Sequence, residues 1–314
     1  MPEILSDLDA LLLVGVDHRL DFCREIVGTE DRPTASERER AASLKKAVFE
    51  GLLCAIENGV PKSQSAIWAD PDLGEGVLLR ARAMSLHAAV SVERPGHGKT
   101  DLGDPTKAWD CATRLDAGTL AARIRYNPSD TLLAREVAQE RLRSLAEKCR
   151  NGGRSLLIEI ASTPTARQIE ENGGEDTARA VVILETMRQL QDSGVEPSGW
   201  AVEPPANKRA ASAIAAQAHL DDRNGIRVLF VVGAEPEPGR GGGGLTRSER
   251  EVAEMAARMP GVSGVLVGPG AYYNALLSLH QGHSVQEDAV QSIGKTINEI
   301  WAVYLRAAAR SEIL

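Results

Sequence analysis

The sequence lacks any apolar run close to the roughly 20 residues that a membrane-spanning helix needs. It also lacks a basic and then apolar stretch at its start, which is the pattern of a secretory leader. We therefore expect a cytoplasmic protein that does not associate with membranes. Basic residues are in deficit too, because the 314 residues carry a formal net charge of -8. Such a surface disfavours nucleic acid and anionic lipid, so we expect no nucleic-acid partner.

Cysteine and aromatic residues are scarce. The four cysteines, Cys23, Cys54, Cys111 and Cys149, lie far apart and form no CxxC pair. This spacing argues against a zinc knuckle and indicates free thiols in a reducing compartment. Aromatic residues make up only 4% of the chain, whereas alanine and leucine abound. That composition suits many amphipathic helices.

What the sequence does contain is a series of short apolar runs, which predict eight β-strands. Several runs are apolar almost throughout, as is typical of strands that are covered on both faces. The predicted strands span residues 11–16, 65–70, 87–93, 121–126, 155–161, 199–203, 227–232 and 262–268.

Helical patterns lie between these strands, with apolar residues spaced three and four positions apart. The clearest patterns span residues 35–59, 131–153, 175–194, 246–261 and 284–309, and shorter ones fall within 71–86 and 204–224. Strand and helix alternating eight times predict a (β/α)8 TIM barrel, with residues 1–314 forming a single domain. The rival is a doubly wound open sheet, which usually has fewer strands, and its GxGxxG turn is absent after the first strand.

Two connections, residues 94–109 and 233–246, have the composition of inserted loops. The second contains four consecutive glycines, which predict a flexible backbone. Each loop is either a tolerated surface insertion or a lid over an active site. The sequence leaves both interpretations open.

Polar side chains gather where the predicted strands end, which is where the active sites of barrels lie. Asp17, His18 and Arg19 follow the first strand directly, and Glu159 lies within the fifth. The other groups at or after strand ends are Asp70, Asp72, Glu93, Arg94, Arg125, Tyr126, Asn127, Glu203 and Glu235. Helix caps or ion pairs also account for many such acids, above all for the two aspartates after the second strand. Asp70 is at the same time a candidate substrate-binding residue.

Several of these residues have two possible roles. Glu159 lies among large apolar neighbours, so it needs a partner, and burial would raise its pKa. His18 is either a general acid or base, or a structural hydrogen-bonding group. Arg19 either clamps a phosphate or carboxylate, or pairs with nearby acids. The turn at Gly268 and Gly270 either offers backbone N–H groups to an anion or only redirects the chain.

A series of short motifs carries a resemblance to known enzymes. In chain order they are VGVDHRLDF, IWADPDLGEGVL, SVERPGHGK, RIRYNPSD, SLLIEIASTP, GWAVEPP and VSGVLVGPGAYY. The series resembles the class I tagatose-1,6-bisphosphate aldolases. It also resembles the domain, similar to 2-deoxy-5-keto-gluconate-6-phosphate aldolase, that is attached to a kinase of bacterial inositol breakdown. The resemblance implies a (β/α)8 barrel that cleaves a phosphorylated ketose or keto-acid into two carbonyl compounds.

The resemblance also implies lysines that this chain does not have. Class I aldolases form a Schiff base between a lysine and the substrate carbonyl. Their strand-six pattern, Lys-Val-Glu or Lys-Leu-Glu, reads Ala201-Val202-Glu203 here, and a second lysine position reads Ala121. The family's Gly-Arg on strand eight, which helps to hold phosphate, reads Gly268-Pro269. Asp17, Arg19, Glu159 and Glu203 match the family pattern.

The chain has only eight lysines, which narrows the search for a substitute. Lys45, Lys46, Lys148 and Lys295 fall on predicted outer helices, where solvated charge is the usual role. Lys62 precedes the second strand, at the wrong end of the barrel, and Lys99 and Lys107 lie in the loop after the third strand. Lys208 follows the sixth strand closely and is the only near substitute.

Three functions follow from these observations. The first is an aldolase-like lyase for a keto-sugar or keto-acid, expected to be phosphorylated, in which hydrogen-bond donors or a divalent metal polarise the carbonyl. Asp17, His18, Glu159 and Glu203 would supply metal ligands, although no HxH pair supports a metal. The others are an inactive barrel serving as a partner subunit, and an isomerase or epimerase using Glu159 and His18 as acid and base.

Two further expectations concern binding and assembly. Arg19, Arg123 or Arg125 would replace the lost phosphate contact, unless the substrate has no phosphate. The last predicted helix carries Trp301 and Tyr304, which pack either on the barrel or at an interface between subunits. We expect a homo-oligomer that binds a small sugar or sugar phosphate and needs no organic cofactor.

Overall fold

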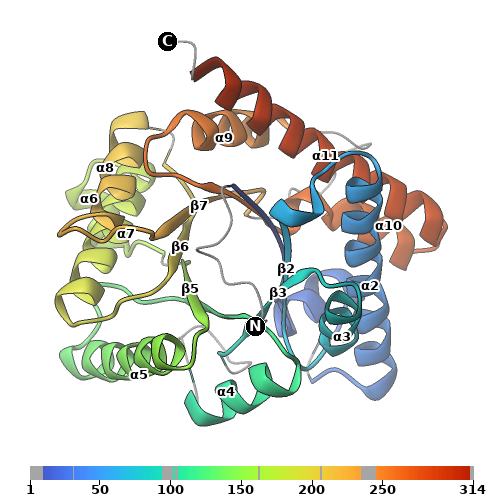
Figure 1. The fold of residues 1–314 in the computed structure, drawn as a ribbon, viewed down its shortest axis with the longest axis horizontal. Coiled ribbons are helices and arrows are strands. Elements are labelled where there is room, and N and C mark those ends of the chain that lie inside the picture. The colour runs from blue at the N-terminus through green and yellow to red at the C-terminus, as the bar shows by residue number, and fades with distance from the viewer. Residues whose placement is uncertain are drawn as a thin grey trace.

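Eight parallel strands close into a barrel in the computed structural model (Figure 1). The structure describes residues 10–30, 32–93, 102, 105–161, 163–205, 207–234 and 245–311. Each strand pairs with the next one in the chain, and β8 pairs with β1. The strands are β1 (Leu11–Val16), β2 (Ser65–Ala69), β3 (His87–Ser91), β4 (Thr119–Ile124), β5 (Ser155–Ile160), β6 (Gly199–Val202), β7 (Arg227–Val232) and β8 (Gly264–Val267). The predicted (β/α)8 barrel is confirmed, and the open sheet is excluded.

Helices surround the strands on the outside of the barrel (Figure 1). The α-helices are α1 (Leu20–Phe22), α2 (Ala35–Glu57), α3 (Glu75–Ala83), α4 (Pro105–Arg114), α5 (Leu132–Asn151), α6 (Ala166–Glu171), α7 (Glu175–Asp192), α8 (Lys208–Ala218), α9 (Arg247–Arg258), α10 (Tyr273–His280) and α11 (Gln286–Ser311). Short π or 3-10 turns are η2 (Cys23–Val27), η3 (Lys62–Gln64) and η4 (Pro269–Ala271).

The predicted strands and longer helices agree with the observed ones apart from their ends, whereas the short helices α4 and α6 were not predicted. The fourth strand begins at Thr119, two residues before its predicted start. The helix α4 begins inside the predicted loop 94–109. Most of that loop's remainder, and residues 235–244 of the other predicted loop, lie outside the described residues. The same holds for Arg94, Lys99 and Glu235.

The alternation of side chains along the strands sorts them between two apolar layers. Along β1, Leu12 and Val14 pack outward under the helices, whereas Leu11 and Leu13 point into the barrel. The barrel interior is filled by Leu11, Leu13, Ala66, Trp68, Ala89, Ala121, Leu157, Ala201, Leu229, Val231 and Leu266. On β4 and β5 the alternation places a polar side chain, Arg123 and Glu159 respectively, at an inward position near the C-terminal end of the strand. These two residues belong to the candidate site.

Helix α2 is fixed at its start by a capping box. The Thr34 side chain accepts the N–H of Glu37, and the Glu37 carboxylate accepts the N–H of Thr34. Such reciprocal caps satisfy N–H groups that have no partner within the helix. The helix then packs against the barrel and against α11.

Helix α11 buries both of its aromatic residues. Trp301 is 2% exposed and Tyr304 is 6% exposed, and their rings stack with centroids 5.0 Å apart. Of the two roles that the sequence left open, packing within the chain therefore accounts for both rings.

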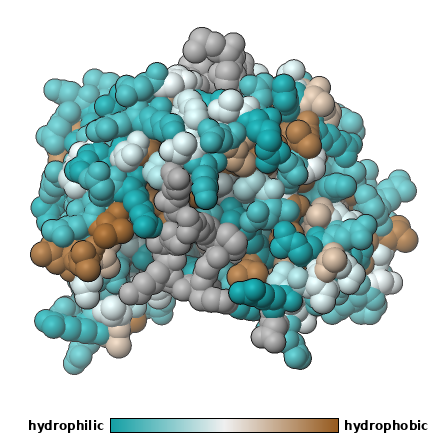
Figure 2. All heavy atoms as spheres, turned by 90° about the horizontal axis from the view of Figure 1, so that it is seen from below, coloured by the Kyte–Doolittle hydropathy of each residue, from teal (hydrophilic) through white to brown (hydrophobic). Residues whose placement is uncertain are grey.

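The face of the molecule in Figure 2 is mainly hydrophilic, with small and separate hydrophobic patches. Within the described part of the chain, no helix combines the length and the apolar character needed to cross a membrane.

Candidate active site

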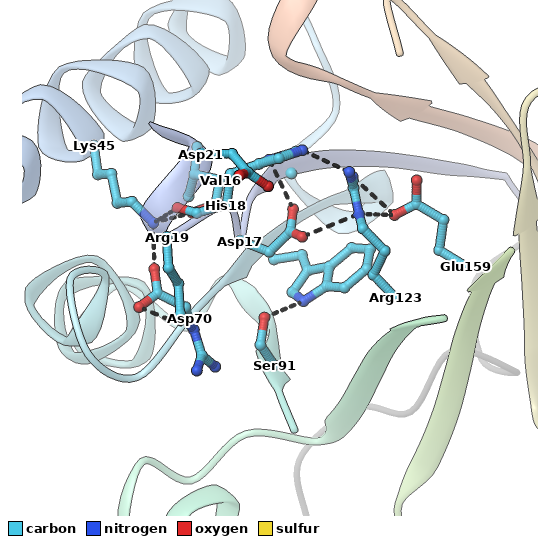
Figure 3. Close-up of polar contacts among 12 residues, drawn as sticks. Val16, Asp17, His18, Arg19, Asp21, Lys45, Asp70, Ser91, Arg123 and Glu159 are labelled. Carbon is cyan, nitrogen blue, oxygen red and sulfur yellow. Dashed lines mark hydrogen bonds and ion pairs between the residues drawn. The ribbon is translucent and has the colours of Figure 1, made fainter. Parts of the chain in front are cut away.

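An arginine whose side chain is only 18% exposed lies at the C-terminal end of the barrel interior (Figure 3). Arg123 comes two residues after the interior Ala121 on β4, so strand alternation directs it inward. Its Nε and Nη2 atoms each lie 3.0 Å from Oε2 of Glu159, which is its register partner on β5. Its Nε also lies 3.4 Å from Oδ2 of Asp17, just after β1. The guanidinium of Arg123 on β4 therefore bridges the carboxylate of Glu159 on β5 and that of Asp17 after β1.

His18 completes the contacts of this guanidinium. Its Nε2 lies 2.5 Å from Nη1 of Arg123, and because a guanidinium only donates, Nε2 accepts and the ring proton lies on Nδ1. Nδ1 in turn lies 3.5 Å from Oδ1 of Asp17. Burial, followed by the charge of Arg123, lowers the pKa of His18 to about 4 against the opposing effect of Asp17. The ring is therefore neutral at pH 7.

Two carboxyl groups in this cluster bind protons near neutral pH. Burial raises the pKa of Glu159 to about 7, and the charge of Asp17 adds to the effect while Arg123 opposes it. Burial likewise raises the pKa of Glu93 to about 7. Oε2 of Glu93 accepts a hydrogen bond from the backbone N–H of Arg123 at 3.4 Å. Burial would also raise the pKa of Asp17, but Arg123 holds it below its usual value. The cluster thus combines one fixed carboxylate with two that exchange protons.

Three residues near this cluster were missed by the sequence analysis. Tyr272 is 1% exposed, and its hydroxyl donates to the carbonyl oxygen of Gly15 at 2.6 Å. Trp68 is fully buried inside the barrel, and its Nε1 donates to Oγ of Ser91 at 2.9 Å. Strand alternation was the available signal for Trp68 and Ser91, since both occupy inward positions two residues after an interior alanine.

Arg19 and Asp70 belong to a neighbouring network at the ends of β1 and β2. Oδ1 of Asp70 lies 3.6 Å from Nε of Arg19 and accepts the N–H groups of Asp72 and Leu73 at 2.9 and 2.7 Å. Nη1 of Arg19 lies 3.1 Å from Oδ2 of Asp72. These contacts match the turn and ion-pair roles that the sequence left open for all three charged residues.

Glu203 and Lys208 lie beside the cluster rather than in it. Glu203 is 2.5 Å from Nη1 of Arg179 on α7, and its side chain is 42% exposed. Lys208 is an exposed residue at the start of α8. Both line a cavity of about 750 Å³, which also reaches Val231 at the end of β7. The described contacts join neither residue to Arg123.

The remaining polar residues of the fourth strand end lie apart from these groups. Arg125 is 43% exposed and lies 3.6 Å from Asp21. The Tyr126 hydroxyl donates to Gln189 of α7 at 2.7 Å, and Oδ1 of Asn127 accepts the N–H of Ser129 at 2.8 Å. Arg123 is thus the inward arginine of this strand.

The backbone N–H groups at the Gly-Pro-Gly turn already have partners within the chain. Gly268 donates to the carbonyl oxygen of Val232 at 2.8 Å, and Gly270 donates to that of Gly233 at 2.9 Å. A Cβ atom on Gly268 would lie only 2.5 Å from the same Gly233 oxygen, so glycine is required by close packing. This geometry fits the turn role, one of the two that the sequence left open.

The two carboxylates nearest to Arg123 already have a cationic partner. No group of three or more His, Cys, Asp or Glu side chains within the described ranges is arranged to hold a metal. Oε2 of Glu159 and Oδ2 of Asp17 already face a guanidinium, which would repel a divalent cation bound to the same two atoms.

With this geometry established, comparisons place the chain among known proteins. Residues 4–307 match the family model described as "uncharacterized protein conserved in bacteria (DUF2090)". The chain belongs to this family. No curated protein matches the chain significantly.

Several solved structures share the fold of this family member. It is similar to a Schiff-base-forming fructose-1,6-bisphosphate aldolase, with 12% identity over 94% of both chains and a TM-score of 0.53. It is similar to an archaeal fructose 1,6-bisphosphate aldolase, with 10% identity over 92% of this chain and 94% of that chain and a TM-score of 0.52. It also resembles the YdjI aldolase of Escherichia coli K12, with 10% identity over 94% of this chain and 91% of that chain and a TM-score of 0.52. The chain is therefore an aldolase-like barrel in fold.

Proposed function

We propose that this chain is an aldolase-like carbon–carbon lyase for a small keto-sugar or keto-acid, and that it works without a lysine imine. The observation that carries the proposal is the guanidinium of Arg123, which is 18% exposed and lies between the buried carboxyl groups of Asp17 and Glu159. In this proposal the guanidinium does the electrostatic work that the iminium does in class I aldolases.

The hydrogen bonds of Arg123 leave one edge of its guanidinium for a substrate. A guanidinium has five N–H groups. Nε and Nη2 each direct one at Glu159, and Nη1 directs one at His18. One N–H on each terminal nitrogen is left over once these contacts among the described residues are made. Two parallel donors suit a carboxylate or an enolate oxygen.

The carboxyl groups beside Arg123 suit the proton transfers of such a cleavage. Glu159 acts as the base and takes the proton of the substrate's β-hydroxyl group. The carbon that carries this hydroxyl becomes a carbonyl, and its bond to the carbon beside the ketone breaks. The bonding electrons pass to the substrate's ketone oxygen as an enolate, which Arg123 stabilises. The protonated carboxyl then returns its proton to the enolate carbon. A pKa of about 7 suits both directions of transfer.

The missing lysine is part of this proposal. Ala201 lies in the barrel interior and pairs in register with Glu159, beside the cluster where the resemblance to tagatose and inositol-pathway aldolases would put the Schiff-base amine. Lys208, which the sequence analysis named as the near substitute, is exposed. Cytoplasmic location, homo-oligomeric assembly, phosphorylation of the substrate and the absence of a cofactor stay predictions.

An isomerase or epimerase is the second candidate. It is favoured by the presence of two carboxyl groups, Glu93 and Glu159, that both titrate near pH 7. Two such groups could serve as base and acid on one substrate without cleaving it.

The test is a screen of keto-sugars and keto-acids, with and without phosphate, in deuterated buffer. We expect a new aldehyde or keto product from cleavage, turnover that survives a chelator, and no protein adduct after borohydride. Deuterium exchange without cleavage would favour the isomerase. A borohydride adduct on Lys208 would contradict the imine-free route, loss of turnover under chelator would contradict the metal-free one, and no reaction would favour the partner-subunit hypothesis.

A further inference from the structure

A lysine on the outer helix α2 is fully buried, contrary to the solvated position predicted for it. Lys45 has no exposed surface, and its ammonium lies 5.3 Å from the centre of the Phe22 ring. A buried charge is costly unless it is paired and hydrogen-bonded. The prediction was wrong because Lys45 lies on the inward side of the helix, next to the buried Leu44 and Val48, rather than on its exposed side.

All three protons of this ammonium are directed at acceptors in the ends of β1 and β2. Lys45 Nζ donates to the carbonyl oxygens of Val16 and His18, each at 2.6 Å, and to Oδ2 of Asp70. An ammonium has three donors and no acceptor. Lys45 is therefore fully occupied as a charged hydrogen-bond donor and is not poised as a nucleophile.

The two carbonyl groups lie on either side of Asp17. In Figure 3, Lys45 reaches them from one side while Asp17 and His18 face Arg123 on the other. Asp17 and His18 lie beyond the end of β1 and before α1, so no strand or helix hydrogen bonds fix them. Asp70 is itself fixed by the N–H groups of the following turn, which makes it a firm anchor for the ammonium.

We infer that Lys45 is a positioning residue, which holds the main chain of residues 16–18 so that Asp17 and His18 face Arg123. The inference rests on the proposed function only in treating these side chains as part of an active site. Asp70 acts with it as the fixed end of the clamp. This anchoring role of Asp70 differs from the substrate-binding role that the sequence predicts for it.

The test compares Lys45→Met with Lys46→Met, the same change at the exposed neighbouring residue of α2. The readout is nitrogen NMR of the His18 ring, which reports its tautomer and pKa without any substrate. The charged groups facing this ring are Arg123 of β4, Asp17, Lys45 of α2 and Asp21 of α1. We expect the wild type and Lys46→Met to keep one neutral tautomer with a pKa near 4.

In Lys45→Met we expect both tautomers and a His18 pKa higher by at least about 1 pH unit, because a nearby positive charge is lost and the ring becomes more solvated. We also expect kcat for any reaction found to fall about 100-fold, as for a catalytic group misplaced by about 1 Å. A His18 tautomer and pKa equal to those of the wild type would overturn the inference, whether or not the protein proves to be a lyase.

Lys45→Met leaves the buried Asp70 with Arg19 as its one remaining charged partner among the described residues, which threatens the folding of the variant. The double variant Lys45→Met/Asp70→Asn removes both buried charges together, which proteins tolerate better. If it folds with the circular dichroism of the wild type, His18 should again show both tautomers. A wild-type His18 signal in the folded double variant would overturn the inference.

Discussion

At the scale of residues, the site is a balance between burial and one positive charge. Arg123 is surrounded by Asp17, Glu159 and Glu93, so it cannot neutralise all three fully. Asp17 keeps its charge, whereas the two glutamates have raised pKa values. The cluster holds exchangeable protons because burial raises the pKa of both glutamates by more than the neighbouring arginines lower it.

This balance predicts a stability that falls as pH rises from 6.5 to 8. A carboxyl with a folded pKa of about 7 is protonated in the folded chain and ionised in the unfolded chain at pH 6.5, so the folded state binds more protons and loses stability as it releases them. His18, with its lowered pKa, opposes this only slightly, because the unfolded imidazole is mostly neutral above pH 6.5.

We expect the free energy of unfolding of the wild type to fall by about 1 kcal/mol across this range, and by about half as much in Glu159→Gln. Urea titrations at several pH values measure it. Equal pH dependence in the two proteins would show that Glu159 does not titrate there.

At the scale of elements, the pairing of β1 with β8 closes the barrel and leaves no room for a side chain at Gly264. Gly264 begins β8 opposite Leu11 of β1, and a Cβ atom there would lie 2.1 Å from the Leu11 carbonyl oxygen. That approach is far shorter than any van der Waals contact, and the obstacle is backbone, which cannot rotate away.

We therefore expect Gly264→Ala to lower the free energy of unfolding by about 2 kcal/mol or more, or to prevent folding. The control is Gly76→Ala in the helix α3, where the new Cβ would meet only the flexible end of Lys46, and stability should be kept or rise slightly. Thermal unfolding of both variants measures this. A Gly264→Ala protein as stable as the wild type would mean that β1 and β8 do not pair as described.

The elements could be predicted from the sequence more readily than the site. Apolar runs such as residues 11–16 and 227–232 could be read as strands, because a parallel barrel buries its strands on both faces and therefore requires apolar residues along them. The contacts of Arg123 could not be predicted, because they join β4 to β5 and to the end of β1. Lys45 was misplaced for the same reason, since helical spacing alone does not reveal which acceptors lie beneath a helix.

At the scale of the whole molecule, an aldolase-like barrel carries an interior with an arginine and no lysine among its described residues. Lys45 is buried outside the barrel wall, and Lys208 is exposed beside the cavity of about 750 Å³. The fold is shared with a Schiff-base-forming aldolase, whereas the group proposed to stabilise the enolate is the guanidinium of Arg123 rather than a lysine iminium.

The most direct test of this account is the turnover of Arg123→Lys on the substrate found in the screen, with Arg143→Lys on the outer helix α5 as the control. The lysine keeps the positive charge but loses the two parallel donors. We predict that kcat falls about 100-fold to 1,000-fold with little change in KM, as for the loss of an oxyanion-stabilising donor. Turnover of Arg123→Lys within about 3-fold of the wild type, without a borohydride adduct, would contradict the central role of the guanidinium.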